Sequence, residues 1–188
     1  MASPSKLVDE PRDEEIVRLV LGGDREAFRV LVRRYQDGLY RYALSMTSQE
    51  DVAADVVQAS LVKAYAQMAR CREPERFGAW VYRIVANGCK DHLKSRRRRD
   101  VRLDDAGAAI PAGSANPASD LERAELRREL NGALAQLNEP MRQAFVLKHV
   151  EGRSYEEIAE ILDVSVPALK MRVHRAREAL RQTLEEVL

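Results

Sequence analysis

A stretch near the middle of the chain, residues 104–120, divides the sequence into two parts. It is rich in Ala, Gly, Pro and Ser, contains no Lys or Arg, and has Ile110 as its single large apolar residue. Such a segment cannot bury enough apolar surface to offset the entropy of ordering it. We therefore predict two folded domains, at residues 13–100 and 121–188, joined by a flexible linker at residues 101–120.

Apolar residues recur at helical spacing on both sides of this linker. Of the 188 residues, 45% are hydrophobic but only 5% are aromatic, and the sequence has few runs of the residues that strands favour. Leu, Val, Ala and Tyr instead repeat every three or four positions over residues 28–46, 53–68 and 77–97. The predicted fold class is therefore all-α, with two small helical domains.

Residues that favour helix ends mark the helix boundaries. Before the linker, Asp24 is placed to cap the pattern that begins at residue 28. After the linker, Pro140 suits the first turn of a helix, and Gly152 suits its end. Ser154 and Glu157 form a capping box that opens a short helix, and Ser165 is placed to cap the last helix.

The two last helices have the pattern of a helix-turn-helix. A short capped helix is followed by a tight turn at residues 162–164 and by a helix in which cations outnumber acids. If Leu169 and Val173 face the core, then Lys170, Arg172 and Arg175 point outward, where they can reach guanine edges or phosphates in a major groove. The alternative interpretation is a basic face that contacts only solvent.

The helix over residues 77–97 begins with aromatic residues and becomes cationic towards its end. Aromatic rings near cations suit single-stranded nucleic acid, because bases stack on the rings and phosphates pair with the cations. Trp80 and Tyr82 are alternatively core residues, and for Trp80 we favour the core. The arginines are also favoured at a helix end by the helix dipole.

The sequence contains no pattern typical of a catalytic or metal site. It lacks a phosphate-binding loop, a zinc-binding helix and a nucleophile elbow, and its three histidines are scattered. Cys71 and Cys89 are either ordinary thiols or oxidant sensors with a lowered pKa. We therefore expect no enzyme activity, no metal and no cofactor. Without a segment long and apolar enough to cross a membrane, the protein is expected in the cytoplasm.

Several motifs occur together in one order. They are FGAWVYRIVAN at residues 77–87 and DHLKSRR at 91–97 before the linker, and LNEPMRQAF at 137–145, GRSYEEIA at 152–159 and VHRAR at 173–177 after it. In these motifs the chain resembles the extracytoplasmic-function (ECF) sigma factors, which are promoter-specificity subunits of bacterial RNA polymerase. The resemblance covers residues 13–184.

This resemblance implies a role for each domain. The first domain would bind the clamp helices of RNA polymerase core and melt the minus-ten promoter element, with a flipped base read by residues 71–77 and Asn87. The second would sit on the polymerase flap and read the minus-thirty-five element. The implied minus-ten residues are Phe77, Arg83, Asn87, Lys90, Lys94 and Arg97. The implied minus-thirty-five residues are Lys170, Met171, Arg172, His174 and Arg175, and the implied core-binding residues are Asp55, Gln58 and Val62.

The resemblance also implies a regulator. We expect a free monomer that an anti-sigma factor represses and in some cells holds at the inner membrane. Acidic residues usual on the clamp-binding helix are replaced by Val52, Ala54 and Ala59. Either Glu50 and Asp51 substitute for them, or apolar contacts from Val56, Leu61 and Val62 compensate, or a phosphate on Ser48 or Ser60 restores the charge. The alternative function is that of a helix-turn-helix regulator that binds an operator as a dimer without polymerase.

Overall fold

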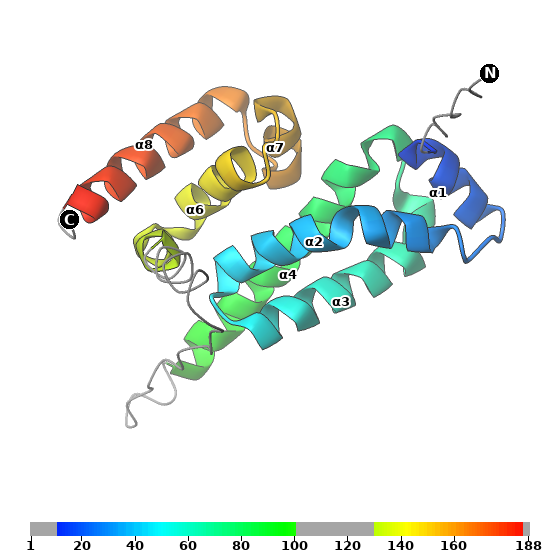
Figure 1. The fold of residues 1–188 in the computed structure, drawn as a ribbon, viewed down its shortest axis with the longest axis horizontal. Helices are drawn as coiled ribbons and strands as arrows, with labels where there is room; N and C mark the ends of the chain where they lie inside the picture. Colours follow the sequence, from blue (N-terminus) through cyan, green and yellow to red (C-terminus); the bar gives the residue numbers. More distant parts are fainter. Residues whose placement is uncertain (1–10, 101–129, 186–188) are drawn as a thin grey trace, which may run out of the picture.

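The computed structural model describes residues 11–100 and 130–185, and all regular structure within these two ranges is helical (Figure 1). The all-α prediction is therefore confirmed. The predicted linker at residues 101–120 lies outside the described residues. Within each range the helices pack against one another.

Three long helices form the body of the first domain. The helices α2 and α3 lie side by side, and α4 packs against both (Figure 1). The shorter α1 contacts α2 and α4, and two single-turn 3₁₀ segments connect α3 to α4. The bounds are α1 Asp13–Leu21, α2 Phe28–Thr47, α3 Glu50–Ala66, η1 Met68–Arg70, η2 Pro74–Arg76 and α4 Phe77–Asp100.

The turn between α1 and α2 forms as its sequence predicts. Gly23 has a φ of 103°, a left-handed conformation that glycine adopts without strain. The Asp24 carboxylate then accepts hydrogen bonds from the backbone N–H groups of Glu26 and Ala27 at 3.0 and 3.2 Å. These bonds hold the turn at residues 25–27 just before α2, whose own N-cap residue, Ala27, has no side-chain cap.

The second domain contains a helix over residues 130–136, then α6 (Glu139–Phe145), the π-helix η3 (Val146–Val150), α7 (Tyr155–Leu162) and α8 (Val166–Glu185). The Asn138 side chain caps α6 by accepting from the Met141 N–H at 3.0 Å. Gly152, at a φ of 66°, ends the η3 segment as expected. The π-helical turn itself has no counterpart in the sequence prediction, which had one regular helix there.

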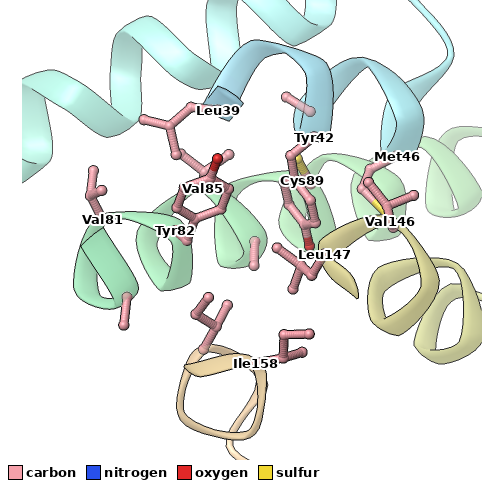
Figure 2. Packing of buried hydrophobic residues seen from close by; sticks show 14 of the residues in the cluster. Leu39, Tyr42, Met46, Val81, Tyr82, Val85, Cys89, Val146, Leu147 and Ile158 are labelled. Carbon is pink, nitrogen blue, oxygen red and sulfur yellow. The ribbon is translucent and has the colours of Figure 1, made fainter. Parts of the chain in front are cut away.

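The two domains pack against each other through a continuous apolar core. The helix α7 contacts α4, and both α6 and η3 contact α2. Figure 2 shows side chains from these elements facing one another; the labelled ones are Leu39, Tyr42, Met46, Val81, Tyr82, Val85, Cys89, Val146, Leu147 and Ile158. We call this contact between the domains the seam. It places the second domain over one face of α4.

Candidate nucleic-acid and polymerase interfaces

The outward face of α8 carries most of the residues expected at the minus-thirty-five element. Leu169 and Val173 are buried, as the helical spacing predicts. Their burial turns the opposite side of the helix outward. Lys170, Met171, His174 and Arg175 are exposed, and Arg172 is half-buried. The helix therefore offers a face with cations and one large apolar side chain, Met171, which suits phosphates and base edges in a groove.

A sharp turn sets the direction of α8. Asp163 has a φ of 53°, so the chain reverses within a single residue after α7. The Val164 N–H donates to the Ala159 carbonyl at 3.0 Å, which closes the end of α7. The Ser165 hydroxyl accepts from the Ala168 N–H at 3.4 Å and so caps α8 as predicted. Together these bonds form the helix-turn-helix.

The start of α7 is held by the predicted capping box. The Ser154 hydroxyl accepts from the Glu157 N–H at 3.1 Å, and the Glu157 carboxylate accepts from the Ser154 N–H at 2.9 Å. Arg153 also pairs with Glu157 at 3.2 Å. Partial burial opposes ionisation, but these hydrogen bonds and the charge of Arg153 lower the pKa of Glu157 below its ordinary value of 4.5.

A stripe of polar residues runs along α4. Arg83, Asn87, Lys90 and Lys94 are exposed, and their spacing places them on one side of the helix. The side chain of Arg97 lies outside the described residues. An amide among cations can hydrogen-bond a base edge while its neighbours bind phosphates. The stripe therefore has the chemistry expected for the minus-ten element.

Phe77, predicted to contact a base, is instead a core residue. Its exposed fraction is 0%, and its ring lies 5.6 Å from the Tyr35 ring and 5.8 Å from the Trp80 ring between centroids. The prediction for Phe77 is therefore wrong for this structure, because the first turn of α4 packs against α2. Trp80 is half-buried and Tyr82 is buried, which agrees with the core alternative for both rings.

The loop before α4 exposes charged side chains. Arg72, Glu73, Glu75 and Arg76 are exposed, whereas Cys71 is buried. These side chains lie next to the N-terminal end of α4. This loop therefore presents charged side chains to a nucleic acid and has no exposed aromatic ring.

One face of α3 presents the residues expected to contact polymerase. Asp55, Gln58 and Val62 are exposed, and their spacing places them along one side of the helix. Val62 is 64% exposed, so this face also offers one large apolar side chain. Ser60 is only 4% exposed and faces Gly88 of α4, so this hydroxyl is not available for phosphorylation in the folded protein, whereas Ser48 is exposed.

The thiols are buried and have no feature of redox sensors. Burial raises the pKa of Cys71 to about 11 and the pKa of Cys89 to about 12. Neither thiol forms a disulfide. Reactive thiols instead have a lowered pKa. The structure therefore favours the ordinary-thiol interpretation over the oxidant sensor.

Within residues 11–100 and 130–185 there is no group of three or more His, Cys, Asp or Glu side chains placed to hold a metal ion. In the same ranges, no helix is both long enough and apolar enough to span a bilayer.

The sequence did not predict the polar contacts at the seam. Arg83, expected on the minus-ten element, donates to the Glu160 carbonyl of α7 at 3.1 Å. Glu151, which follows η3, accepts from Arg41 of α2 and Tyr82 of α4. Residues so distant along the chain share no local pattern, so no motif in the sequence indicated these pairs.

Two family models match separate parts of the chain. The family described as Sigma-70 region 2 matches residues 31–99, and the family described as Sigma-70, region 4 matches residues 127–180. The two matches fall on the two helical groups of the structure. They also contain all the motifs on which the resemblance to sigma factors rests.

Curated relatives match nearly the whole chain. The RNA polymerase sigma-H factor of Pseudomonas aeruginosa is 33% identical over 97% of this chain and 98% of its own length. The ECF RNA polymerase sigma-E factor of Haemophilus influenzae is 32% identical over 97% of this chain and 100% of its own. That of Escherichia coli K12 is 34% identical over 94% and 96%.

Solved structures share the fold. The chain resembles CnrH in complex with the cytosolic domain of CnrY, with a TM-score of 0.70 and 28% identity over 93% of this chain and 97% of the other. It also resembles the sigma factor RpoE in complex with the anti-sigma factor NepR from Bartonella quintana, with a TM-score of 0.71 and 29% identity over 84% and 96%.

Proposed function

The chain belongs to the ECF sigma factors, and from this premise we propose a division of promoter recognition between its exposed faces. As a member of this family it binds RNA polymerase core and directs initiation at specific promoters, and it is not an enzyme. The observation that carries the residue-level proposal is the exposure of three separate stripes, on α3, α4 and α8.

We assign the stripe on α4 to the minus-ten element. Asn87 is the base-reading residue, because its amide carries both a donor and an acceptor for a base edge. Arg83, Lys90 and Lys94 bind the phosphates on either side of it. Unstacking a base costs a few kcal/mol, so an amide that stabilises the flipped base favours the melted promoter.

We assign the outward face of α8 to the minus-thirty-five element. Lys170 and Arg175 extend from an exposed helix face beyond a capped turn, as recognition helices require. Met171, 51% exposed, is available for apolar contact with a thymine methyl group. His174 lies 3.5 Å from Glu178, so a base contact by His174 would have to replace that pair.

We assign the exposed side of α3, with Asp55, Gln58 and Val62, to the polymerase clamp. Because Ala54 and Ala59 are also exposed but carry no charge, this face offers fewer acids than the family pattern. The double variant Ala54→Glu with Ala59→Glu is expected to bind core more tightly, since each exposed ion pair contributes about 0.2–1 kcal/mol. A core affinity equal to that of wild type would show that charge does not limit this contact.

An anti-sigma factor is the expected repressor, and the cytoplasm is the expected location, because promoter DNA and polymerase are there. Both solved relatives named above are complexes, one with an anti-sigma factor and one with a cytosolic domain. A pull-down from uninduced native cells should recover a small protein that covers α3 and α8. Recovery of polymerase alone would contradict this part of the proposal.

Run-off transcription tests the function directly. Purified core polymerase with this protein should initiate at a subset of genomic promoters, and core alone should not. The absence of any added transcript across a promoter library would overturn the proposal. A gel shift without polymerase distinguishes a sigma factor from an operator-binding regulator. The regulator would bind its duplex unaided, whereas a sigma factor should need core polymerase.

A further inference from the structure

The carboxylate of Glu151 joins the two domains. Its side chain is 3% exposed and accepts two hydrogen bonds from the Arg41 guanidinium, both at 3.1 Å. The Tyr82 hydroxyl donates to it at 2.8 Å. The Arg153 guanidinium lies over the Tyr82 ring, 4.5 Å from its centroid. A buried carboxylate of one domain is thus held by α2 and α4 of the other.

A glycine makes this contact sterically feasible. A Cβ atom added at Gly38 would lie 2.3 Å from the Tyr82 hydroxyl and 2.7 Å from a Glu151 carboxylate oxygen. Real Cβ atoms do not approach other atoms so closely, so with any other residue at this position the Tyr82 hydroxyl and the Glu151 carboxylate would have to shift. The seam as it stands therefore fits a residue without a side chain in the middle of α2.

The contacts around Glu151 continue on both sides. Arg76 pairs with the Glu160 carboxylate at 3.3 Å, and Arg83 donates to the carbonyl of the same residue. At the other end, Arg142 of α6 donates to the Met46 carbonyl of α2 at 3.1 Å. The minus-ten face of α4 is thus partly engaged by α7.

The closed arrangement does not fit a promoter. Elements centred near minus ten and minus thirty-five are about 25 base pairs apart, which at about 3.4 Å per base pair is a span of about 85 Å. In this structure α7, one half of the helix-turn-helix, rests directly on α4. The domains must therefore separate before each can reach its own element.

We propose that Glu151 is an intramolecular latch that keeps this sigma factor closed and unable to engage a promoter when no partner is bound. The proposal rests on the function proposed above. Opening exchanges the Arg41 and Tyr82 contacts for water. Polymerase and promoter must therefore bind the open molecules. Their apparent affinity is the intrinsic affinity multiplied by the fraction of molecules that are open.

Two substitutions should open the latch, and each has a matched control. Gly38→Ala places a methyl group against the Tyr82 hydroxyl but favours the α2 helix itself, since Ala has a higher helix propensity than Gly. Gly132→Ala is its control, because a Cβ at Gly132 meets nothing within 4 Å. Glu151→Gln removes the charge, and Glu156→Gln makes the same change at an exposed site on α7.

Single-molecule Förster transfer in the full chain measures the ratio of open to closed molecules. Dyes are attached at Ala69→Cys and Asn131→Cys, two exposed positions in different domains. The native thiols are buried and compete little for the dyes. We expect Gly38→Ala and Glu151→Gln each to raise the open-to-closed ratio about tenfold, the size of a lost charge-assisted hydrogen bond. Both control variants should keep the wild-type ratio.

A substitution expected to favour the closed state distinguishes a specific latch from general destabilisation of the seam. The Tyr42 ring points from α2 towards Leu147 of η3 in Figure 2, and its buried hydroxyl has no hydrogen-bond partner among the described residues. Tyr42→Phe should lower the open-to-closed ratio about fivefold, because closure no longer desolvates that hydroxyl. Opening by every seam variant, including Tyr42→Phe, would overturn the latch.

The proposal would also be overturned if the wild-type protein is mostly open. It would be overturned as well if the variants at Gly38 and Glu151 stay as closed as wild type. A run-off transcription assay distinguishes failure of the latch from failure of the proposed sigma-factor function. If opening behaves as expected, the core concentration for half-maximal run-off should fall with Glu151→Gln and not with Glu156→Gln. Normal opening with no transcript from any variant would leave the latch in place and refute the proposed function instead.

Discussion

The capping box of α7 allows one local interaction to be tested by two different substitutions. Ser154→Ala removes the hydroxyl that accepts from the Glu157 N–H at 3.1 Å. Glu157→Gln keeps an oxygen that can accept from the Ser154 N–H but removes the charge that faces Arg153 at 3.2 Å. The first change tests the cap, and the second tests the ion pair.

The expected magnitudes differ. Loss of a serine cap costs about 1 kcal/mol, which corresponds to about fivefold more frequent opening of the helix. The Glu157 side chain is 43% exposed, so solvent screens its ion pair with Arg153. For such an exposed pair four residues apart we expect about 0.3–0.5 kcal/mol, or about twofold.

The hydrogen bonds from Ser154 and the ion pair with Arg153 together predict a pH dependence. The folded pKa of Glu157 is lowered from 4.5, so its stabilising effect is complete above that value. As the pH falls through the lower folded pKa, the carboxylate binds a proton in the folded state too, and the stabilisation is lost. In Glu157→Gln this acid-dependent loss should be absent, since the amide does not titrate.

Hydrogen exchange of the full chain, resolved to the peptide over Tyr155–Leu162, measures both effects after correction for the intrinsic exchange rate at each pH. Glu156→Gln is the control, since that glutamate is exposed on the same helix turn. Unchanged protection in Ser154→Ala would refute the reasoning about the cap. Equal acid sensitivity in Glu157→Gln and wild type would refute the reasoning about the ion pair.

Three further predictions concern the exposed faces and the thiols. Asn87→Ala should reduce permanganate reactivity of the minus-ten element on duplex promoters but not on a pre-melted template, because its base is exposed only after melting; equal loss on both would contradict this role. Arg175→Ala should weaken promoter binding by the core complex by about 1–3 kcal/mol in footprint titrations, and an unchanged affinity would show a merely solvated face. Cys71 and Cys89 should resist iodoacetamide at pH 8 in mass spectrometry of the folded protein, because burial raises their pKa values to about 11 and about 12; rapid labelling of both would contradict the burial.

Helix boundaries were the most predictable part of this protein. Asp24 and Ser154 each hydrogen-bond to backbone groups within three residues, as their positions in the sequence indicated. Such bonds depend on local geometry alone, so a sequence pattern is sufficient to identify them. The all-α class followed from the same kind of local information.

Helical spacing also predicted most of the exposed faces. Leu169 and Val173 are buried and Arg175 is exposed, because a helix that buries one side must expose the other. Phe77 shows where this reasoning fails. The residue begins its helix as expected, but whether its ring faces solvent depends on Tyr35, which belongs to a helix far earlier in the chain.

The sequence by itself indicated the long helices, several of their caps and the family to which the chain belongs. Only the tertiary structure decided that the domains close on each other and which side chains hold them there. Glu151 and Arg41 are 110 residues apart, and the fit at Gly38 involves atoms from three separate segments. Pairing across such separations is set by the packing of whole helices, which leaves no periodic or local signature in the sequence.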